Sequence, residues 1–323
     1  MKWRLRQIGP RARVCHLSDR LVLPHRSIGP NKLLMGSYTP TGSMDPETSL
    51  SRRYHPLLQH HIGQAHQNIP KPVETLEKAI FAGPQFAAYG HFLLESLARL
   101  WTAPNYSDDP IVWSVQPADP ASALLPWMHE ILAILGLSNP IKLINQPIAV
   151  RNLMFPASGY EIQYRFGHTH SEFLARVPWA PEIGNKLWLS RAGVEEQHGT
   201  GRNELEDALI SDGWKIIKPE TMSINAQMEA FACAERIAGE QGSALHSLIL
   251  MQPAKGLRVD VFARDPRLEG HFVNANQEAI CLRRRIDYRF HRMEEETVLE
   301  QCGPRITKIF APPAAYLDCL AKA

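Results

Sequence analysis

The sequence has 323 residues, of which 44% are hydrophobic and 21% are charged, and its formal net charge at pH 7 is +2. A chain of this length exceeds what one hydrophobic core usually organises, so we expect two domains. The net charge is too small to indicate a nucleic-acid partner or a general attraction to membranes, and we expect no nucleic-acid partner.

The five cysteines are scattered and show neither Cys-x-x-Cys nor zinc-type spacing, which is typical of a reducing compartment. No apolar run approaches the ~20 residues that a membrane-spanning helix needs. The residues after Met1 lack the apolar segment of a signal peptide. We therefore expect a cytoplasmic protein, with peripheral contact to the inner face of the membrane left open.

Residues 1–75 contain short apolar runs separated by proline and glycine, and they predict no regular element. From Glu77 onwards the pattern alternates between strands and helices. The predicted strands cover residues 78–81, 111–115, 141–144 and 149–155, and the predicted helices cover 86–101, 121–137 and 171–177. Such alternation predicts a mainly parallel sheet covered by helices.

Two prolines and a glycine within residues 178–185 predict a linker, and we place the domain boundary between residues 180 and 181. Beyond it the alternation restarts, and Ser223 predicts the N-cap of a helix. The predicted strands cover 186–190, 214–218, the run to 238, 257–262 and 288–290, and the predicted helices cover 203–211, 224–235, 276–283 and the segment after Pro313. The two arrays predict an α/β protein of two Rossmann-like domains that face a central cleft, with a return of the last helix to the first domain left open.

The first candidate motif is the run from Tyr89 to Trp101. His91, Glu95 and Arg99 recur every fourth residue, so a regular helix would present all three on one face. If this face borders the cleft, His91 or Glu95 is placed to take a proton from an acceptor hydroxyl. The alternative is a solvated helix face with a Glu95–Arg99 ion pair.

The second candidate motif follows the strand that is predicted over residues 186–190. Ser190 and Arg191 lie at its carboxyl end, where open α/β sheets bind ligands, and an arginine there suits bidentate contact with a diphosphate. Arg202, at the next helix start, adds a second positive charge. The alternative is a surface arginine that pairs with Glu204 or Glu206.

The third candidate motif, Gly239 to Met251, predicts a strand end, a tight glycine turn and the opening of a helix. Gly242 lets the backbone approach a ligand, Ser243 can cap the helix, and the N–H groups of the first turn around Ala244 can receive a phosphate. His246 follows one turn later, and Glu240 can bind ribose hydroxyls or a sugar. The alternative is an ordinary strand–turn–helix connection.

Several known chemistries do not fit the sequence. It contains no Gly-Lys-Ser/Thr phosphate loop, no Gly-x-Gly-x-x-Gly dinucleotide fingerprint, no Gly-x-Ser-x-Gly elbow and no Asp-x-Asp. No His/Cys/Asp cluster has metal-ligand spacing. We therefore expect no cofactor and no metal that bridges a diphosphate.

Taken together, the three blocks resemble glycosyltransferase family 61, including bacterial members associated with capsular and other surface polysaccharides. The resemblance covers about residues 75 to 262. It implies a GT-B-like fold and inverting transfer from a nucleotide sugar without an obligatory divalent metal. Carried over position by position, it points to these site residues: His91, Glu95, Arg99, Ser190, Arg191, Arg202, Glu240, Gly242, Ser243 and His246. Where eukaryotic relatives usually have histidine this chain has Gln241, which leaves the donor nucleotide open.

The leading hypothesis is thus a hexosyl- or pentosyltransferase that acts on a growing surface glycan or glycolipid. Residues 1–180 would form the acceptor side, and residues 181–323 would bind the nucleotide sugar. Closure of the cleft would exclude water that hydrolyses the donor. Two alternatives stay open: another polysaccharide-modifying transferase, such as a pyruvyl transferase, and a non-catalytic scaffold of a polysaccharide assembly.

Overall fold

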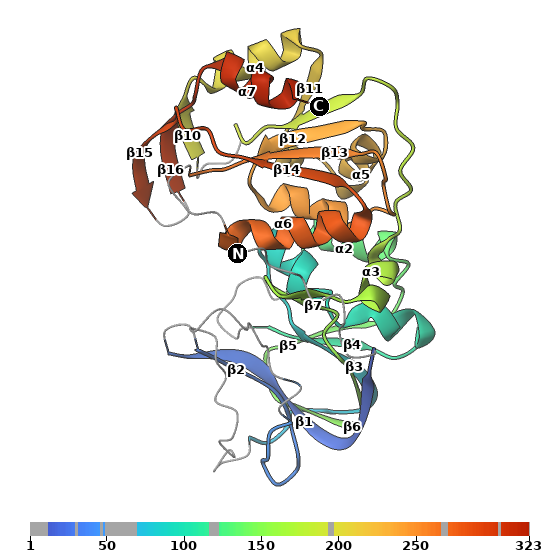
Figure 1. Cartoon of the computed structure of the whole chain (residues 1–323). Coiled ribbons are helices and arrows are strands. Elements are labelled where there is room, and N and C mark those ends of the chain that lie inside the picture. The colour runs from blue at the N-terminus through green and yellow to red at the C-terminus, as the bar shows by residue number, and fades with distance from the viewer. Residues whose placement is uncertain are drawn as a thin grey trace. The chain divides into compact units, whose positions relative to one another are not determined.

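A computed structural model describes residues 12–29, 32–45, 48, 70–115, 123–192, 197–265, 271–302 and 305–322. They divide into two compact units, unit 1 (Met1–Leu174) and unit 2 (Ala175–Ala323), whose elements are labelled in Figure 1. The division falls a few residues before the predicted boundary at 180/181. The cleft expected between two domains stays a prediction.

Unit 1 contains a six-stranded sheet with the order β2-β1-β6-β3-β4-β5. Its parallel strands are β3 (Thr75–Pro84), β4 (Ile111–Ser114), β5 (Ile141–Ile144) and β6 (Ile148–Pro156). The antiparallel strands β1 (Val14–Gly29) and β2 (Lys32–Tyr38) complete it, in a segment where the sequence predicts no regular element. The pairing of β1 with β2 shifts register between Leu23 and Arg26, which accommodates Pro24 within β1.

The helix predicted over residues 86–101 is wrong as a single regular helix. The chain instead forms a short α-helix, α1 (Tyr89–His91), a π-helical turn, η3 (Phe92–Ser96), and a 3₁₀-helix, η4 (Leu100–Asn105). The backbone N–H of Leu97 donates to the carbonyl of Phe92, five residues earlier, so the spacing differs here from a 3.6-residue period.

The remaining elements of unit 1 follow the predicted order with shifted ends. Helix α2 (Pro126–Ile134) begins at Pro126, because proline suits the first position of a helix but not its interior. Helix α3 (His168–Leu174) begins before the predicted 171–177, and a small hairpin, β7 (Tyr160–Glu161) with β8 (Arg165–Phe166), precedes it. Within the described ranges, no helix is long and apolar enough to cross a membrane.

Unit 2 is built on an all-parallel sheet with the order β11-β9-β12-β13-β14. Its strands are β9 (Lys186–Leu189), β11 (Trp214–Ile217), β12 (Arg236–Glu240), β13 (Arg258–Phe262) and β14 (Asp287–His291). Counted along the chain, the strand order is 2-1-3-4-5, one of the two common doubly wound orders. The alternation predicted from the sequence is confirmed in this unit.

Helices cover both faces of this sheet. Helix α4 (Arg202–Ser211) and α7 (Pro313–Ala321) lie on one side of the strands, and α6 (His271–Arg284) lies on the other (Figure 1). The predicted N-cap Ser223 of α5 (Ile224–Ala232) is confirmed, since its hydroxyl accepts from the N–H of Ala226 at 3.1 Å. Tyr316 and Leu320 of α7 join the core of unit 2, so the last helix packs on this sheet.

Three strands outside the main sheet complete unit 2, and the sequence analysis did not predict them. They are β10 (Gln197–Thr200), β15 (Thr297–Cys302) and β16 (Arg305–Ile309), which pair in the order β10-β16-β15. Two 3₁₀-helices, η5 (Pro219–Thr221) and η6 (Ser243–Leu250), connect strands of the main sheet.

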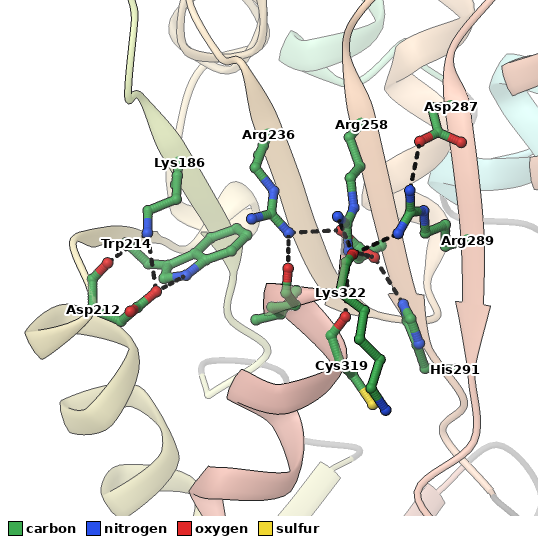
Figure 2. A network of polar contacts seen from close by, with 12 residues as sticks. Lys186, Asp212, Trp214, Arg236, Arg258, Asp287, Arg289, His291, Cys319 and Lys322 are labelled. Atoms are coloured by element: carbon green, nitrogen blue, oxygen red, sulfur yellow. Dashed lines mark hydrogen bonds and ion pairs between the residues drawn. The ribbon is translucent and has the colours of Figure 1, made fainter.

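A buried carboxylate in the middle of β13, Asp260, pairs with side chains of the neighbouring strands, several of which are labelled in Figure 2. Asp260 is fully buried and accepts from Arg258 Nε at 2.8 Å, while His291 Nε2 lies 2.8 Å from its other oxygen. Arg236, the first residue of β12, also binds the end of α7, because it donates to the carbonyl of Leu320 at 2.6 Å. Arginines at the start of the strands thus compensate both the buried carboxylate and the negative end of a helix.

Candidate active site

Two predicted residues of unit 1 form a pair at the α1–η3 junction. The Nδ1 atom of His91 lies 2.6 Å from Oε2 of Glu95. The histidine side chain is 45% exposed and the glutamate side chain is 4% exposed, so the buried carboxylate holds an imidazole that reaches the surface. When Nδ1–H donates to a carboxylate, the neutral ring carries its basic lone pair on Nε2. The arrangement is therefore suited to accepting a proton.

Arg99 lies beyond the π-helical turn, as the residue before η4, although the sequence predicts that it continues the helical face of His91 and Glu95. Its guanidinium lies 4.2 Å from the ring centroid of Phe155 and donates to the carbonyl of Pro156 at 2.7 Å. The physical reason is the π-helical turn, which changes the angular spacing after Glu95 and ends the four-residue repeat. Arg99 is thus a buried contact to the end of β6.

In unit 2, the strand order creates a switch point between β9 and β12. The chain leaves β9 towards β11 on one side, and it leaves β12 towards β13 on the other, so the two connections diverge at the carboxyl edge. Open α/β sheets bind ligands in the crevice at such a point. Both remaining predicted motifs follow these two strands, and the sequence could not show that β9 and β12 are neighbours.

Arg191, just after β9, lies against the glycine turn after β12. A Cβ atom added to Gly242 would lie 2.2 Å from Nη1 of Arg191, so a larger residue here would have to displace this guanidinium. Ser190 is buried and donates to Oε1 of Glu206 at 2.6 Å, and it accepts from the N–H of Ala192 at 3.1 Å. Ser190 therefore shapes the turn that carries Arg191.

Glu240, the last residue of β12, is enclosed by cations. Its side chain is 1% exposed, and its two oxygens lie 2.9 Å from Nη1 of Arg202 and 2.9 Å from Nζ of Lys308. Burial alone would raise the pKa of Glu240, but the charges of Lys308, Arg202 and Arg191 outweigh burial, and the pKa lies below its usual value. Glu240 is thus a buried anion paired with two cations.

The helix after the glycine turn differs in type from the predicted one. It is the 3₁₀-helix η6, and Gly242 occupies the N-cap position without a side-chain cap, so the capping role predicted for Ser243 is wrong. Ser243, Ala244 and His246 all lie in η6. Because residues three apart eclipse one another in a 3₁₀-helix, Ser243 and His246 share one edge of η6.

Sequence reasoning missed Lys308, which is 3% exposed on β16. It also lies 2.8 Å from Glu296 Oε2, and the Tyr316 hydroxyl donates to the other oxygen of Glu296. One signal was present in the sequence. Strand alternation places Lys308 on the same side as Phe310, and a lysine on the apolar side of a strand calls for a buried partner.

No group of three or more histidine, cysteine, aspartate or glutamate residues, among those the structure describes, is placed to hold a metal ion. Arg191, beside the Gly242 turn, is partly exposed and can contact a phosphate or diphosphate. The His91–Glu95 pair can accept a proton.

Comparison with known proteins gives one clear match. The family model Glycosyltransferase 61 matches residues 89–258, which is more than half of the chain. The matched segment contains the His91–Glu95 pair, Arg191 and the Gly242 turn. Among curated proteins, none matches the chain. The chain therefore belongs to glycosyltransferase family 61 and is a glycosyltransferase.

Proposed function

We propose that this protein transfers a sugar, with inversion, from a nucleotide sugar to a hydroxyl of a glycan or glycolipid during surface polysaccharide biosynthesis. The proposal includes a GT-B-like pair of Rossmann-like domains and a reaction that needs no divalent metal. It also places the reaction in the cytoplasm, where contact with the inner face of the membrane gives access to a lipid-linked acceptor. Sugar, nucleotide and linkage are left to experiment.

One observation supports this proposal most strongly: the Arg191 guanidinium lies against the Gly242 turn at the switch point of a 2-1-3-4-5 sheet. A departing nucleoside diphosphate accumulates negative charge, and a planar guanidinium contacts two of its oxygens at once. Backbone N–H groups at the start of η6 add donors beside it. These groups would stabilise the leaving group in the transition state.

The His91–Glu95 pair would supply the base. In an inverting transfer, the acceptor oxygen attacks the anomeric carbon while the bond to the diphosphate oxygen breaks, and the acceptor proton passes to a base. His91 suits that role because its side chain reaches the surface, whereas Glu95 is buried and holds the ring at 2.6 Å. We therefore assign His91 as base and Glu95 as the residue that orients it.

Thermal unfolding tests the proposal with the full chain in the presence of EDTA. UDP, GDP, CDP, ADP and dTDP are screened, and at least one should raise Tm, because a ligand that binds only the folded state stabilises it. Phosphoenolpyruvate serves as the comparison ligand, and a shift with it alone would indicate pyruvyl transfer. The proposal is abandoned if no nucleoside diphosphate raises Tm and if H91A, E95A and R191A leave the host glycan unchanged.

A further inference from the structure

A cluster of four buried charged residues joins the main sheet of unit 2 to its small sheet. Glu240 ends β12, Arg202 begins α4, and Lys308 lies on β16, while Glu296 lies just before β15. All four side chains are buried, with at most 8% of each residue exposed. Lys308 and Glu296 lie outside the segment matched by the family model.

Lys308 occupies the central position in this cluster. Its ammonium lies 2.9 Å from Glu240 and 2.8 Å from Glu296, so one cation serves two carboxyl groups. Burial raises the pKa of Glu296, whereas the pKa of Glu240 lies below its usual value despite burial, through Lys308 and Arg202. Lys308 and Arg202 together thus stabilise the negative charge of Glu240.

Arg202 is held by the same arrangement. Its guanidinium lies 2.9 Å from Glu240 and 4.6 Å from the ring centroid of Phe310, and the Lys308 ammonium also lies 4.6 Å from that ring. Glu240 is followed directly by the turn at Gly242 that contacts Arg191. A shift of Glu240 would therefore change both the position of Arg202 and the turn against which Arg191 lies.

We propose that Lys308 is a positioning residue of the donor site. Lys308 and Arg202 hold Glu240 from two sides, and Glu240 in turn fixes the Gly242 turn against which Arg191, the residue that would contact a diphosphate, lies. This inference rests on the proposed function. It makes the β15–β16 hairpin part of the donor-binding machinery, although the hairpin lies beyond the family-matched residues. Loss of Lys308 would leave Glu240 and Glu296 without the cation that they share.

The test compares diphosphate affinity with stability. Isothermal titration calorimetry is performed on the full chain with the nucleoside diphosphate that stabilises the wild type most, well below each variant's Tm. K308M should lower Tm and raise Kd by about tenfold or more, by analogy with the affinity lost when residues that hold a metal ligand in place are removed. A purely structural lysine would lower Tm and leave the Kd of the folded protein unchanged.

A second variant keeps the test decisive if K308M folds poorly. K308M/E296Q removes one buried charge of each sign and leaves an amide oxygen to accept from the Tyr316 hydroxyl. It should recover most of the lost Tm but keep the raised Kd, because Glu240 is still held from one side only. Wild-type Kd in this double variant would overturn the inference.

The matched control is K186M, which removes another lysine of the same sheet. Lys186 lies 2.9 Å from Asp212 at the amino edge, away from the switch point, and its loss should leave Kd unchanged. If the wild type itself binds none of the nucleoside diphosphates, the proposed function fails. Failure of the inference is recognised differently, by tight binding in the wild type and in K308M/E296Q alike.

Discussion

Two residues, His91 and Glu95, carry the proposed proton transfer, and their pairing gives a direct prediction. E95Q replaces a buried carboxylate with an amide of the same size, so the imidazole keeps a neighbour but loses the charge that stabilises its protonated form. We expect kcat to fall by about 10- to 100-fold with little change in the donor KM. Initial rates at saturating donor and acceptor measure this effect.

Unit 1 offers a control of the same type. His168 and Glu172 also form a pair four residues apart, with Nε2 and Oε1 separated by 3.2 Å, but both side chains are mostly exposed. E172Q should therefore leave kcat unchanged, since exposed pairs contribute little. Equal kcat values for E95Q and the wild type would contradict the assignment of Glu95 as the orienting residue.

Gly242 tests the arginine contact by steric means alone. Its φ of −178° is accessible to any residue, so alanine introduces no backbone strain, and its methyl group meets only Arg191 at close range. The obstructed atom ends a flexible side chain, so we expect G242A to move the guanidinium and weaken diphosphate binding by roughly 1.5–3 kcal/mol, the usual contribution of hydrogen bonds to charged groups. Calorimetric titration measures the change in Kd.

A double-variant cycle separates this contact from other effects of the methyl group. In the R191A background the obstructed atom is absent, so G242A should cause no further loss of affinity. Additive losses in the double variant would mean that the methyl group acts on something other than Arg191. In that case the observation that most supports the proposed donor site would lose its force.

At the scale of elements, the sequence predicted what depends on local periodicity. The parallel strands of unit 2 and the Ser223 N-cap follow from residue patterns and are confirmed. The α1–η3 junction was missed because the four-residue repeat of His91, Glu95 and Arg99 is compatible with a regular helix. Only tertiary contacts, such as that of Arg99 with Phe155, decide against it.

The candidate site was predictable only in part, because local periodicity locates the ends of strands but not which strands are neighbours. Arg191 and Gly242 were found as strand-end residues, but their contact depends on β9 and β12 being neighbours, which a strand pattern does not reveal. Lys308 was missed because its partner Glu240 is remote in sequence and lies on another sheet. Strand order and long-range ion pairs are properties of the folded chain, not of a local window.

The Asp260 cluster predicts a stability effect at the level of the unit 2 sheet. Asp260 contacts Arg258, Arg236 and His291, and D260N leaves two arginines and a histidine around a neutral amide (Figure 2). Removing one partner from a buried ion pair usually costs about 3–5 kcal/mol. We expect the free energy of unfolding to fall by that amount, as measured by urea denaturation at pH 7.

A partly exposed carboxylate of the same unit, Asp212, serves as the control. Asp212 lies 2.9 Å from Lys186 and is 50% exposed, so D212N should cost no more than about 1 kcal/mol. Similar losses for D212N and D260N would show that burial of Asp260 does not distinguish the two sites. A small loss for both would mean that the arginines around Asp260 are satisfied by the carbonyls of α7, such as that of Leu320.

For the whole molecule, the buried carboxylates set the response to acid. Burial alone would raise the pKa of Asp260, but hydrogen bonds from His291 and Arg258 outweigh it, and the pKa lies below its usual value, as it does for Glu240. For both groups the folded state binds fewer protons than the unfolded state. Their stabilisation is thus fully present above the unfolded pKa values, about 4, and is lost as the pH falls through the folded values.

Glu296 acts in the opposite direction. Burial raises its pKa, so its contribution is fully present below the unfolded value and is lost as the pH rises through the folded value. The contribution of Glu296 changes above its unfolded pKa, and the contributions of Asp260 and Glu240 change below theirs. A measurement of stability against pH therefore separates the two contributions. Below about pH 4, the fall in stability comes from groups such as Asp260 and Glu240, whose folded pKa values are lowered.

Urea unfolding of the wild type and D260N between pH 7 and pH 3 tests this assignment. The difference in free energy of unfolding between them should be constant from pH 7 to about pH 5 and shrink as the pH falls below about 4. The reason is that protonation of Asp260 in acid removes its negative charge from the wild type, whereas D260N lacks this charge at every pH. A difference that stays constant down to pH 3 would mean that Asp260 contributes through packing and not through its charge.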